Sequence, residues 1–148
     1  MAETINIGEV AGRLSKDIFR HFLWDVHPKT DDNFKCTNPK YLGDGDKPKL
    51  THPGDVVFNY SDPYLGKEIY LHTDLKSYKA DSIGSTKLRK ALKSLCMTID
   101  CARCSENWRE KYSVDSSEAH EVRGLLFVHN HDSKYVGSFD TAIDKVDL

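Results

Sequence analysis

The fold is decided by the run Lys67-Glu68-Ile69-Tyr70-Leu71-His72-Thr73-Asp74-Leu75-Lys76-Ser77-Tyr78. Its apolar residues recur at every second position, as is typical of a strand. Because strand side chains alternate between the two faces of a sheet, Asp74 and Lys76 are predicted to project from the same face. The opposite face is predicted to carry Ile69, Leu71, Thr73 and Leu75. A carboxylate and an ammonium group are therefore expected side by side on a rigid element.

A second carboxylate belongs to the stretch His52-Pro53-Gly54-Asp55-Val56-Val57-Phe58. Residues 55–60 are predicted to form a strand, and the turn-forming residues 61–66 connect it to the strand over 67–78 as a hairpin. This arrangement allows Asp55 and Asp74 to converge. Two carboxylates are suitable ligands for Mg²⁺ or Mn²⁺, and a neighbouring Lys76 can orient water or stabilise a charged phosphate.

Length and composition indicate one globular domain over residues 1–148. The sequence is 39% hydrophobic and 30% charged, which is ordinary for such a domain. No apolar run approaches the roughly 20 residues of a membrane span, and the first residues lack the pattern of a secretory signal. Four cysteines are too few to predict a disulfide scaffold. The expectation is a cytoplasmic protein with no membrane contact.

The remaining pattern predicts a helix over residues 7–24, a loop over 25–52 with a short strand at 33–37, and a strand over 121–129. A long helix after residue 85 is expected to be capped by Ser85 or Thr86. Its predicted apolar stripe consists of Leu88, Leu92, Leu95, Ile99 and Ala102. The order α-β-β-β-α-β predicts an α/β fold with a small mixed sheet flanked by helices.

With this order of elements, the chain resembles the PD-(D/E)xK nuclease superfamily and its restriction-endonuclease-like fold. The residues that carry the resemblance are Asp55, which follows Pro53-Gly54, and Asp74-Leu75-Lys76 on the adjacent strand. The family pattern usually places the first acid directly after proline, whereas Gly54 intervenes here.

The resemblance implies a Mg²⁺-dependent endonuclease that hydrolyses phosphodiester bonds in DNA. Asp55 and Asp74 would bind the metal, with a main-chain carbonyl near Leu75 as a third ligand. Lys76 would position and deprotonate the attacking water or stabilise charge in the transition state. A further metal ligand is implied on the first helix, where Glu9 is the best match and Asp17 the alternative.

The resemblance also implies a biological setting, since such domains often serve in bacterial restriction or anti-phage defence. No separate recognition domain is visible within 148 residues. Sequence specificity is therefore expected from a partner subunit or a homodimer.

Lysines follow the predicted site closely. The candidate nucleic-acid-binding residues are Lys79, Lys87, Lys90 and Lys93. The last three recur every third residue of the helix, which forms a cationic ridge able to contact phosphates. A solvated helix face would show the same pattern, and the net charge of −2 does not favour nucleic acid binding by the molecule as a whole.

Two other groups of residues suggest metal chemistry. Cys101 and Cys104, with Cys96 nearby, could bind zinc together with His129 and His131, although reduced cysteines packed in a helix are the preferred interpretation. His129, His131 and Asp132 could also form a separate metal site. The preferred interpretation of these three residues is that they are polar residues at the end of a strand that face solvent.

Three functions therefore remain open at this point. The first is a metal-dependent nuclease. The second is the same fold acting as an inactive module that binds nucleic acid or protein. The third is a zinc-stabilised interaction domain centred on Cys101 and Cys104.

Overall fold

The main sheet is mixed, and its strands lie in the order β1-β4-β5-β6. The computed structural model describes residues 6–147. The four strands are β1 (Asp25–Val26), β4 (Val56–Asp62), β5 (Lys67–Tyr78) and β6 (His120–Asn130). β4 pairs antiparallel with β1 and β5, whereas β5 and β6 are parallel. The predicted hairpin over residues 55–78 is thus confirmed.

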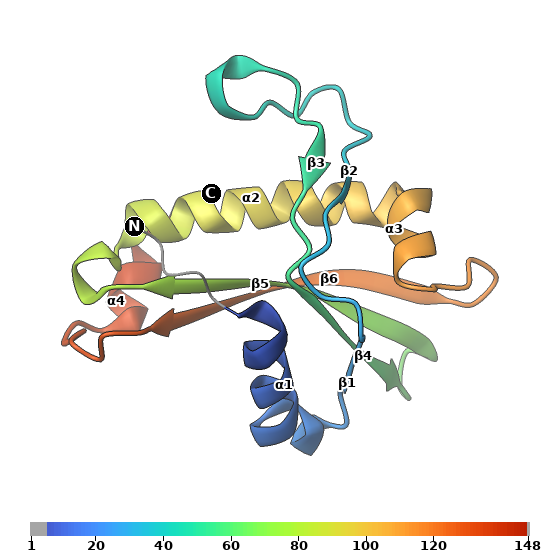
Figure 1. Ribbon diagram of the computed structural model, residues 1–148, viewed down its shortest axis with the longest axis horizontal. Coiled ribbons are helices and arrows are strands. Elements are labelled where there is room, and N and C mark those ends of the chain that lie inside the picture. Colours follow the sequence, from blue (N-terminus) through green and yellow to red (C-terminus); the bar gives the residue numbers. More distant parts are fainter. Residues whose placement is uncertain (1–5, 148) are drawn as a thin grey trace.

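Helices cover both faces of this sheet, as Figure 1 shows with the sheet seen nearly edge-on. One face carries α2 (Ser85–Cys104) and α3 (Glu106–Lys111), and the other carries α1 (Ile7–Asp17). α4 (Phe139–Asp144) packs beside α2. None of the described helices has the length and apolar character that crossing a membrane requires. The predicted α/β fold, a small mixed sheet flanked by helices, is confirmed.

The alternation of strand side chains divides the core in two. On β5, Ile69, Leu71 and Leu75 face α1, where they pack with Ala11 and Leu14. The α2 face contains a larger core, built from Val57, Val122, the α2 stripe and the α3 residue Trp108. The even-numbered residues of β5 consequently project toward α2, and this face holds Asp74 and Lys76.

The first helix is shorter than predicted. α1 ends at Asp17, a 3-10 turn follows over Phe19–Phe22, and Leu23 adopts a left-handed conformation with φ of 60°. Phe19 stacks on Trp24 at 4.8 Å between ring centroids and meets Phe58 edge-on. Residues five apart in a regular helix point about 140° away from each other. The turn is therefore needed to bring both rings onto the sheet.

The strand predicted at residues 33–37 does not belong to the main sheet. It is β2 (Phe34–Lys35), which pairs with β3 (Thr51–His52) in a separate two-stranded sheet. The segment that contains β2 and β3, residues 34–52, includes a 3-10 turn over Asp44–Asp46 and is called the β2–β3 arm below. In Figure 1 this arm extends from the sheet past α2. The first strand of the main sheet is instead β1, within a segment expected to be loop.

α2 begins where predicted but is capped differently. Its N-cap is Gly84, which has no side chain to donate or accept, so neither Ser85 nor Thr86 is the cap. The predicted stripe is confirmed in its main positions, because Leu88, Leu95 and Ile99 are buried.

Candidate active site

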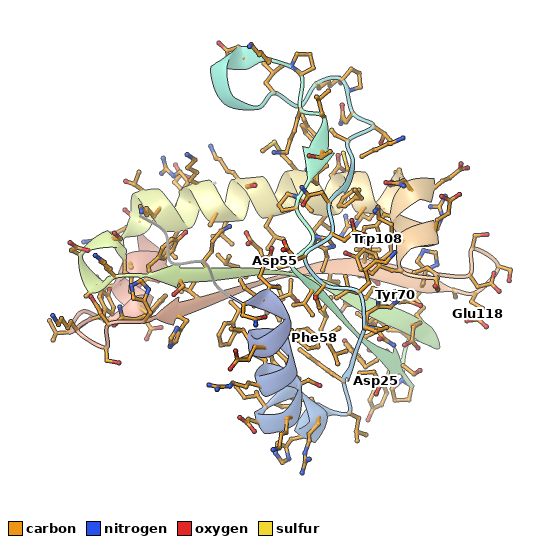
Figure 2. All side chains as sticks on the ribbon, viewed as in Figure 1. Asp25, Asp55, Phe58, Tyr70, Trp108 and Glu118 are labelled. Atoms are coloured by element: carbon orange, nitrogen blue, oxygen red, sulfur yellow. The ribbon has the colours of Figure 1, made fainter. Side chains whose placement is uncertain are left out.

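Asp55 lies at the entrance of β4, directly opposite Asp74 of β5. The register pairs Val56 with Thr73, so the next pair outward is Asp55 and Asp74. The main-chain N–H of Leu75 donates to Asp55 Oδ2 at 2.7 Å, which fixes the carboxylate against β5. Asp55 and Asp74 line a single pocket beneath α2, and Figure 2 shows Asp55 between α1 and α2.

The electrostatic environment disfavours the charge on Asp55. Burial raises the pKa of this carboxyl to about 6, and the adjacent Asp74 carboxylate adds to the rise, while the Leu75 N–H and Lys76 oppose it. Two carboxylates that face each other in a partly dry pocket repel unless a cation lies between or beside them. The pair has the electrostatics of a cation site.

Lys76 supplies one positive charge to this pocket. Its Nζ lies 2.8 Å from Asp74 Oδ1, and the Lys76 side chain is 33% exposed. Burial alone would lower the pKa of Lys76, but its contact with Asp74 and the charges of Asp74 and Asp55 outweigh that effect and raise the pKa. Lys76 is therefore protonated at neutral pH and can donate hydrogen bonds but cannot accept a proton.

The donor set fits a hard divalent cation such as Mg²⁺. Asp74 Oδ1 is fully enclosed and lies 2.8 Å from Lys76 Nζ. No other described residue donates to that oxygen. Two carboxylates and one ammonium leave a net local charge of −1, and carboxylate oxygens are the ligands that Mg²⁺ and Mn²⁺ prefer.

A buried histidine holds the segment that leads to Asp55. Trp108 Nε1–H donates to His72 Nδ1 at 3.1 Å, and His72 Nε2–H donates to the Pro53 carbonyl at 2.8 Å. Burial lowers the pKa of His72, so the ring is neutral. Because both ring nitrogens are engaged, His72 positions the approach to Asp55 and has no free nitrogen to act as an acid or base.

The glycine between Pro53 and Asp55 has a steric reason. A Cβ atom at Gly54 would lie 2.3 Å from the Asp32 carbonyl oxygen and 2.6 Å from Tyr112 Oη. The main chain makes two hydrogen bonds there, from Asp31 N–H to the Asp55 carbonyl and from Asp32 N–H to the Gly54 carbonyl, both 2.9 Å. Gly54 thus allows residues 31–32 to clamp the acid-bearing segment.

Comparison with known proteins identifies the family of the chain. A family model described as the PD-(D/E)XK nuclease domain of GAPS4 proteins matches residues 1–148. The chain belongs to this family. No curated protein and no solved structure matches the chain. The acid and the acid-x-lysine pattern predicted for this PD-(D/E)XK domain are Asp55 and Asp74-Leu75-Lys76; this assignment and their catalytic roles stay predictions.

The first-helix acids of the PD-(D/E)XK domain lie outside the pocket of Asp55 and Asp74. Glu9 is exposed on α1 and pairs with Arg13 at 2.9 Å. Asp17 is exposed at the last residue of α1. The rotation of α1 is set by Ala11 and Leu14, which face the sheet, and Glu9 therefore points largely into solvent. Its role as a metal ligand stays a prediction.

Two of the four candidate nucleic-acid-binding lysines approach the site. Lys87 and Lys90 line a surface groove together with Lys76 and Tyr78, and Lys87 Nζ lies 5.2 Å from the centre of the Tyr78 ring. Lys79 and Lys93 are exposed and do not line this groove. Lys87 and Lys90, two members of the cationic ridge, thus share one groove with Lys76.

Two residues near the site were not predicted from the sequence. Arg13 of α1 lines a second cleft that Lys76 and His129 also line, on the other side of the active-site lysine. Tyr112 projects its hydroxyl toward Gly54; the Oη atom is buried without a partner, and burial together with Asp32 and Asp55 raises its pKa to about 12. The only sequence signal for Arg13 is its position four residues after Glu9, where a helix places the two opposite charges side by side.

The alternative zinc set of Cys101, Cys104, His129 and His131 does not come together among the described residues, in line with the preferred interpretation of reduced cysteines. Arg103 Nε donates to the Val122 carbonyl, so the end of α2 that carries the cysteines lies beside residue 122. His129 is seven residues further along β6, which corresponds to roughly 23 Å. Cys104 is exposed, and His131 contacts Ser77 at the far end of the sheet.

Proposed function

We propose that this protein is a Mg²⁺- or Mn²⁺-dependent endonuclease that cleaves phosphodiester bonds in DNA. The observation that carries the proposal is the shared pocket of Asp55 and Asp74, with Lys76 Nζ 2.8 Å from Asp74 Oδ1. Membership of the PD-(D/E)XK nuclease family supports it, since such domains generally depend on divalent metals.

Asp55 and Asp74 would hold the metal ion. When bound, the ion supplies a Lewis acid that polarises the scissile phosphate and neutralises developing charge. Asp55 keeps one oxygen on the Leu75 N–H, so its second oxygen remains for a ligand. The enclosed Oδ1 of Asp74 provides the other carboxylate ligand atom.

Lys76 acts in this proposal as a hydrogen-bond donor and a positive charge. In the metal-free site the Asp74 and Asp55 carboxylates raise the pKa of Lys76, which favours its protonated form. A fixed ammonium beside the metal pocket can orient the attacking water through its lone pair and stabilise negative charge on the phosphate oxygens. Of the predicted roles of Lys76, we therefore adopt the positioning of water and the stabilisation of charge, and leave out the removal of a proton.

The substrate would approach along the groove that Lys76, Tyr78, Lys87 and Lys90 line. Lysines at this spacing suit successive phosphates of a nucleic acid strand, and the Tyr78 ring offers an aromatic surface beside them. We extend the path to Lys79 and Lys93 as further phosphate contacts at its ends.

The cellular context is part of the same proposal. We propose a cytoplasmic protein that serves in bacterial restriction or anti-phage defence, with a partner subunit or a second copy of the chain providing sequence specificity. The resemblance to restriction-endonuclease-like domains supports this setting, and the few positions that carry the motif leave specificity to other surfaces.

The decisive experiment is a plasmid-nicking assay with purified protein. The wild-type chain is incubated with supercoiled DNA and Mg²⁺, Mn²⁺ or EDTA, alongside Asp74→Ala, Lys76→Ala and Lys67→Ala. Lys67 is an exposed lysine at the distant end of β5 and serves as the matched control. We expect metal-dependent nicking that falls roughly 100-fold or more in the first two variants and is unchanged in the control.

Folding of each variant is checked by circular dichroism so that loss of activity is not loss of structure. Nicking that persists at the wild-type rate in Asp74→Ala would attribute the activity to a contaminant and reject the proposal. Normal activity in Lys76→Ala alone would leave the metal site and remove the lysine from the mechanism.

A second function, a binding module without catalysis, has one observation in its favour. Because Glu9 lies outside the pocket, the described site holds two acids only. DNA that is retarded by the protein in a gel but stays intact with every divalent metal would support this module over the nuclease.

A further inference from the structure

Cys36, His52 and Cys101 meet on the side of α2 that faces the β2–β3 arm. Cys36 follows β2, His52 ends β3, and Cys101 lies in the last turn and a half of α2. Their ligand atoms lie within 4.8 Å of one another, and among the residues that the structure describes they form the one such set of cysteine, histidine and acidic side chains. His52 and Cys101 are buried, and Cys36 is half-buried.

The separation of the two sulfur atoms matches a shared tetrahedral metal. Cys36 Sγ and Cys101 Sγ are 3.7 Å apart. Two thiolates bound to one tetrahedral zinc, each about 2.3 Å from the metal, would be separated by about 3.8 Å. The pair is therefore already at the ligand-to-ligand distance of a zinc site.

The hydrogen bonds of His52 leave one ring nitrogen, Nε2, free. Thr98 Oγ1 donates its hydrogen to the Ser94 carbonyl at 2.9 Å, so its 3.2 Å contact with His52 Nδ1 requires Nδ1–H to be the donor. Nε2 then carries a lone pair, and this atom is fully buried without any partner. A lone pair left bare in the core is costly unless something binds it.

We propose that Cys36, His52 and Cys101 bind a zinc ion. Two sulfurs and one imidazole are the donors that zinc prefers, and Thr98 provides the outer hydrogen bond that fixes the histidine tautomer in such sites. A water on the half-exposed side of Cys36 would complete the four ligands. Both thiols lose their protons on binding, so each zinc ion releases about two protons near neutral pH.

The site would anchor the β2–β3 arm to α2. Two ligands come from the arm and one from the helix, and Figure 1 shows the arm crossing α2 at this level. His52 lies three residues before Asp55 in the chain. Zinc would therefore hold the chain on the approach to the carboxylate pocket, at a place separate from the pocket itself.

The experiment measures zinc in the full chain, purified without an affinity tag and under reducing conditions. Elemental analysis is made on the wild type and on Cys36→Ser, Cys101→Ser, Cys96→Ser and Cys104→Ser. Cys96 and Cys104 are exposed on α2 and are the matched controls. We expect about one zinc per chain in the wild type and both controls, and a loss of zinc in Cys36→Ser and Cys101→Ser.

A second measurement does not depend on the folding of those variants. The wild-type apoprotein is titrated with Co²⁺, for which two thiolate ligands predict a sulfur-to-cobalt charge-transfer band and the visible absorption of tetrahedral cobalt. Thr98→Val is expected to weaken Zn²⁺ binding about 10- to 100-fold while preserving the cobalt spectrum.

Three outcomes would overturn the proposal. One is a wild-type protein without zinc that shows no cobalt–thiolate band. Another is zinc retained in Cys36→Ser or Cys101→Ser. The third is a disulfide between Cys36 and Cys101, which lowers the mass of the chain by two hydrogens under non-reducing conditions, in a protein that still binds no zinc after the disulfide is reduced.

Discussion

The surroundings of Asp55 disfavour the ionised form of its carboxyl group. Its folded pKa of about 6 lies above the ordinary value of 3.8, so the folded protein binds this proton more tightly than the unfolded chain does. Ionisation of Asp55 therefore destabilises the folded protein. This loss of folding stability is absent below about pH 4, grows between pH 4 and 6, and is complete above pH 6. A metal ion in the pocket would remove it.

Asp55→Asn is therefore predicted to stabilise the protein in metal-free buffer while abolishing metal binding. The amide keeps the oxygen that accepts the Leu75 N–H and removes the repulsion from Asp74. We expect the free energy of unfolding to rise by about 1–2 kcal/mol at pH 8, after a reduction for partial solvent screening, and to be unchanged near pH 4. Urea denaturation with EDTA at both pH values measures this; an equal effect at pH 4 would contradict the assignment.

Gly54 offers a test of the clamp at residues 31–32. Alanine there must displace the Asp32 carbonyl or the Tyr112 hydroxyl, so Gly54→Ala is expected to cost about 2 kcal/mol or more in unfolding free energy and to reduce nicking. Gly12→Ala is the matched control, because nothing lies within 4 Å of its added Cβ. In the interior of α1 this alanine should stabilise by up to about 1 kcal/mol. A tolerated Gly54→Ala would show that the clamp yields easily.

At the scale of elements, one histidine connects α3, β5 and the segment before β4. His72→Phe keeps an aromatic ring but leaves Trp108 Nε1–H and the Pro53 carbonyl without partners. Each buried unpaired group costs about 1–3 kcal/mol, so a loss of about 2–4 kcal/mol is expected in urea denaturation. His21→Phe on the exposed 3-10 turn is the control and should change stability by only a few tenths of a kcal/mol. Equal free energies of unfolding for the two variants would show that the hydrogen bonds of His72 do not stabilise the fold.

The elements also show what the sequence could reveal. The convergence of Asp55 and Asp74 follows from local rules, because a two-residue period and a short turn determine the register of a hairpin. The rotation of α1 and the end of its helix depend on Phe19 and Trp24 meeting Phe58, which no local pattern specifies. The Cys36, His52 and Cys101 set was missed for the same reason, since its members are brought together by the path of the arm across α2.

For the whole molecule, electrostatics must act locally, because a net charge of −2 gives no general attraction to nucleic acid. If Lys87 and Lys90 contact phosphates, Lys87→Gln/Lys90→Gln should reduce the slope of log affinity against log salt by about 1–2. Fluorescence anisotropy with labelled DNA and the Asp74→Ala protein, which is expected to be inactive, measures this slope. Lys67→Gln should leave it unchanged, and Lys79→Gln/Lys93→Gln tests how far the path extends. A slope that Lys87→Gln/Lys90→Gln does not alter would place the DNA elsewhere.

The mixed sheet also has a consequence for the order of folding. β4 and β5 form a local hairpin, whereas the parallel partner β6 comes about 50 residues after β5, beyond α2 and α3. Hairpins form within microseconds, while a ribosome needs roughly 1–5 s to synthesise the chain from the end of β5 to the end of α2. β4 and β5, which position Asp55 and Asp74, can thus pair on the nascent chain before α2 is there to cover them. For those seconds the carboxylates of Asp55 and Asp74 stand in water, where their repulsion is screened, and the energetic conflict between them develops only as α2 closes over the finished pocket.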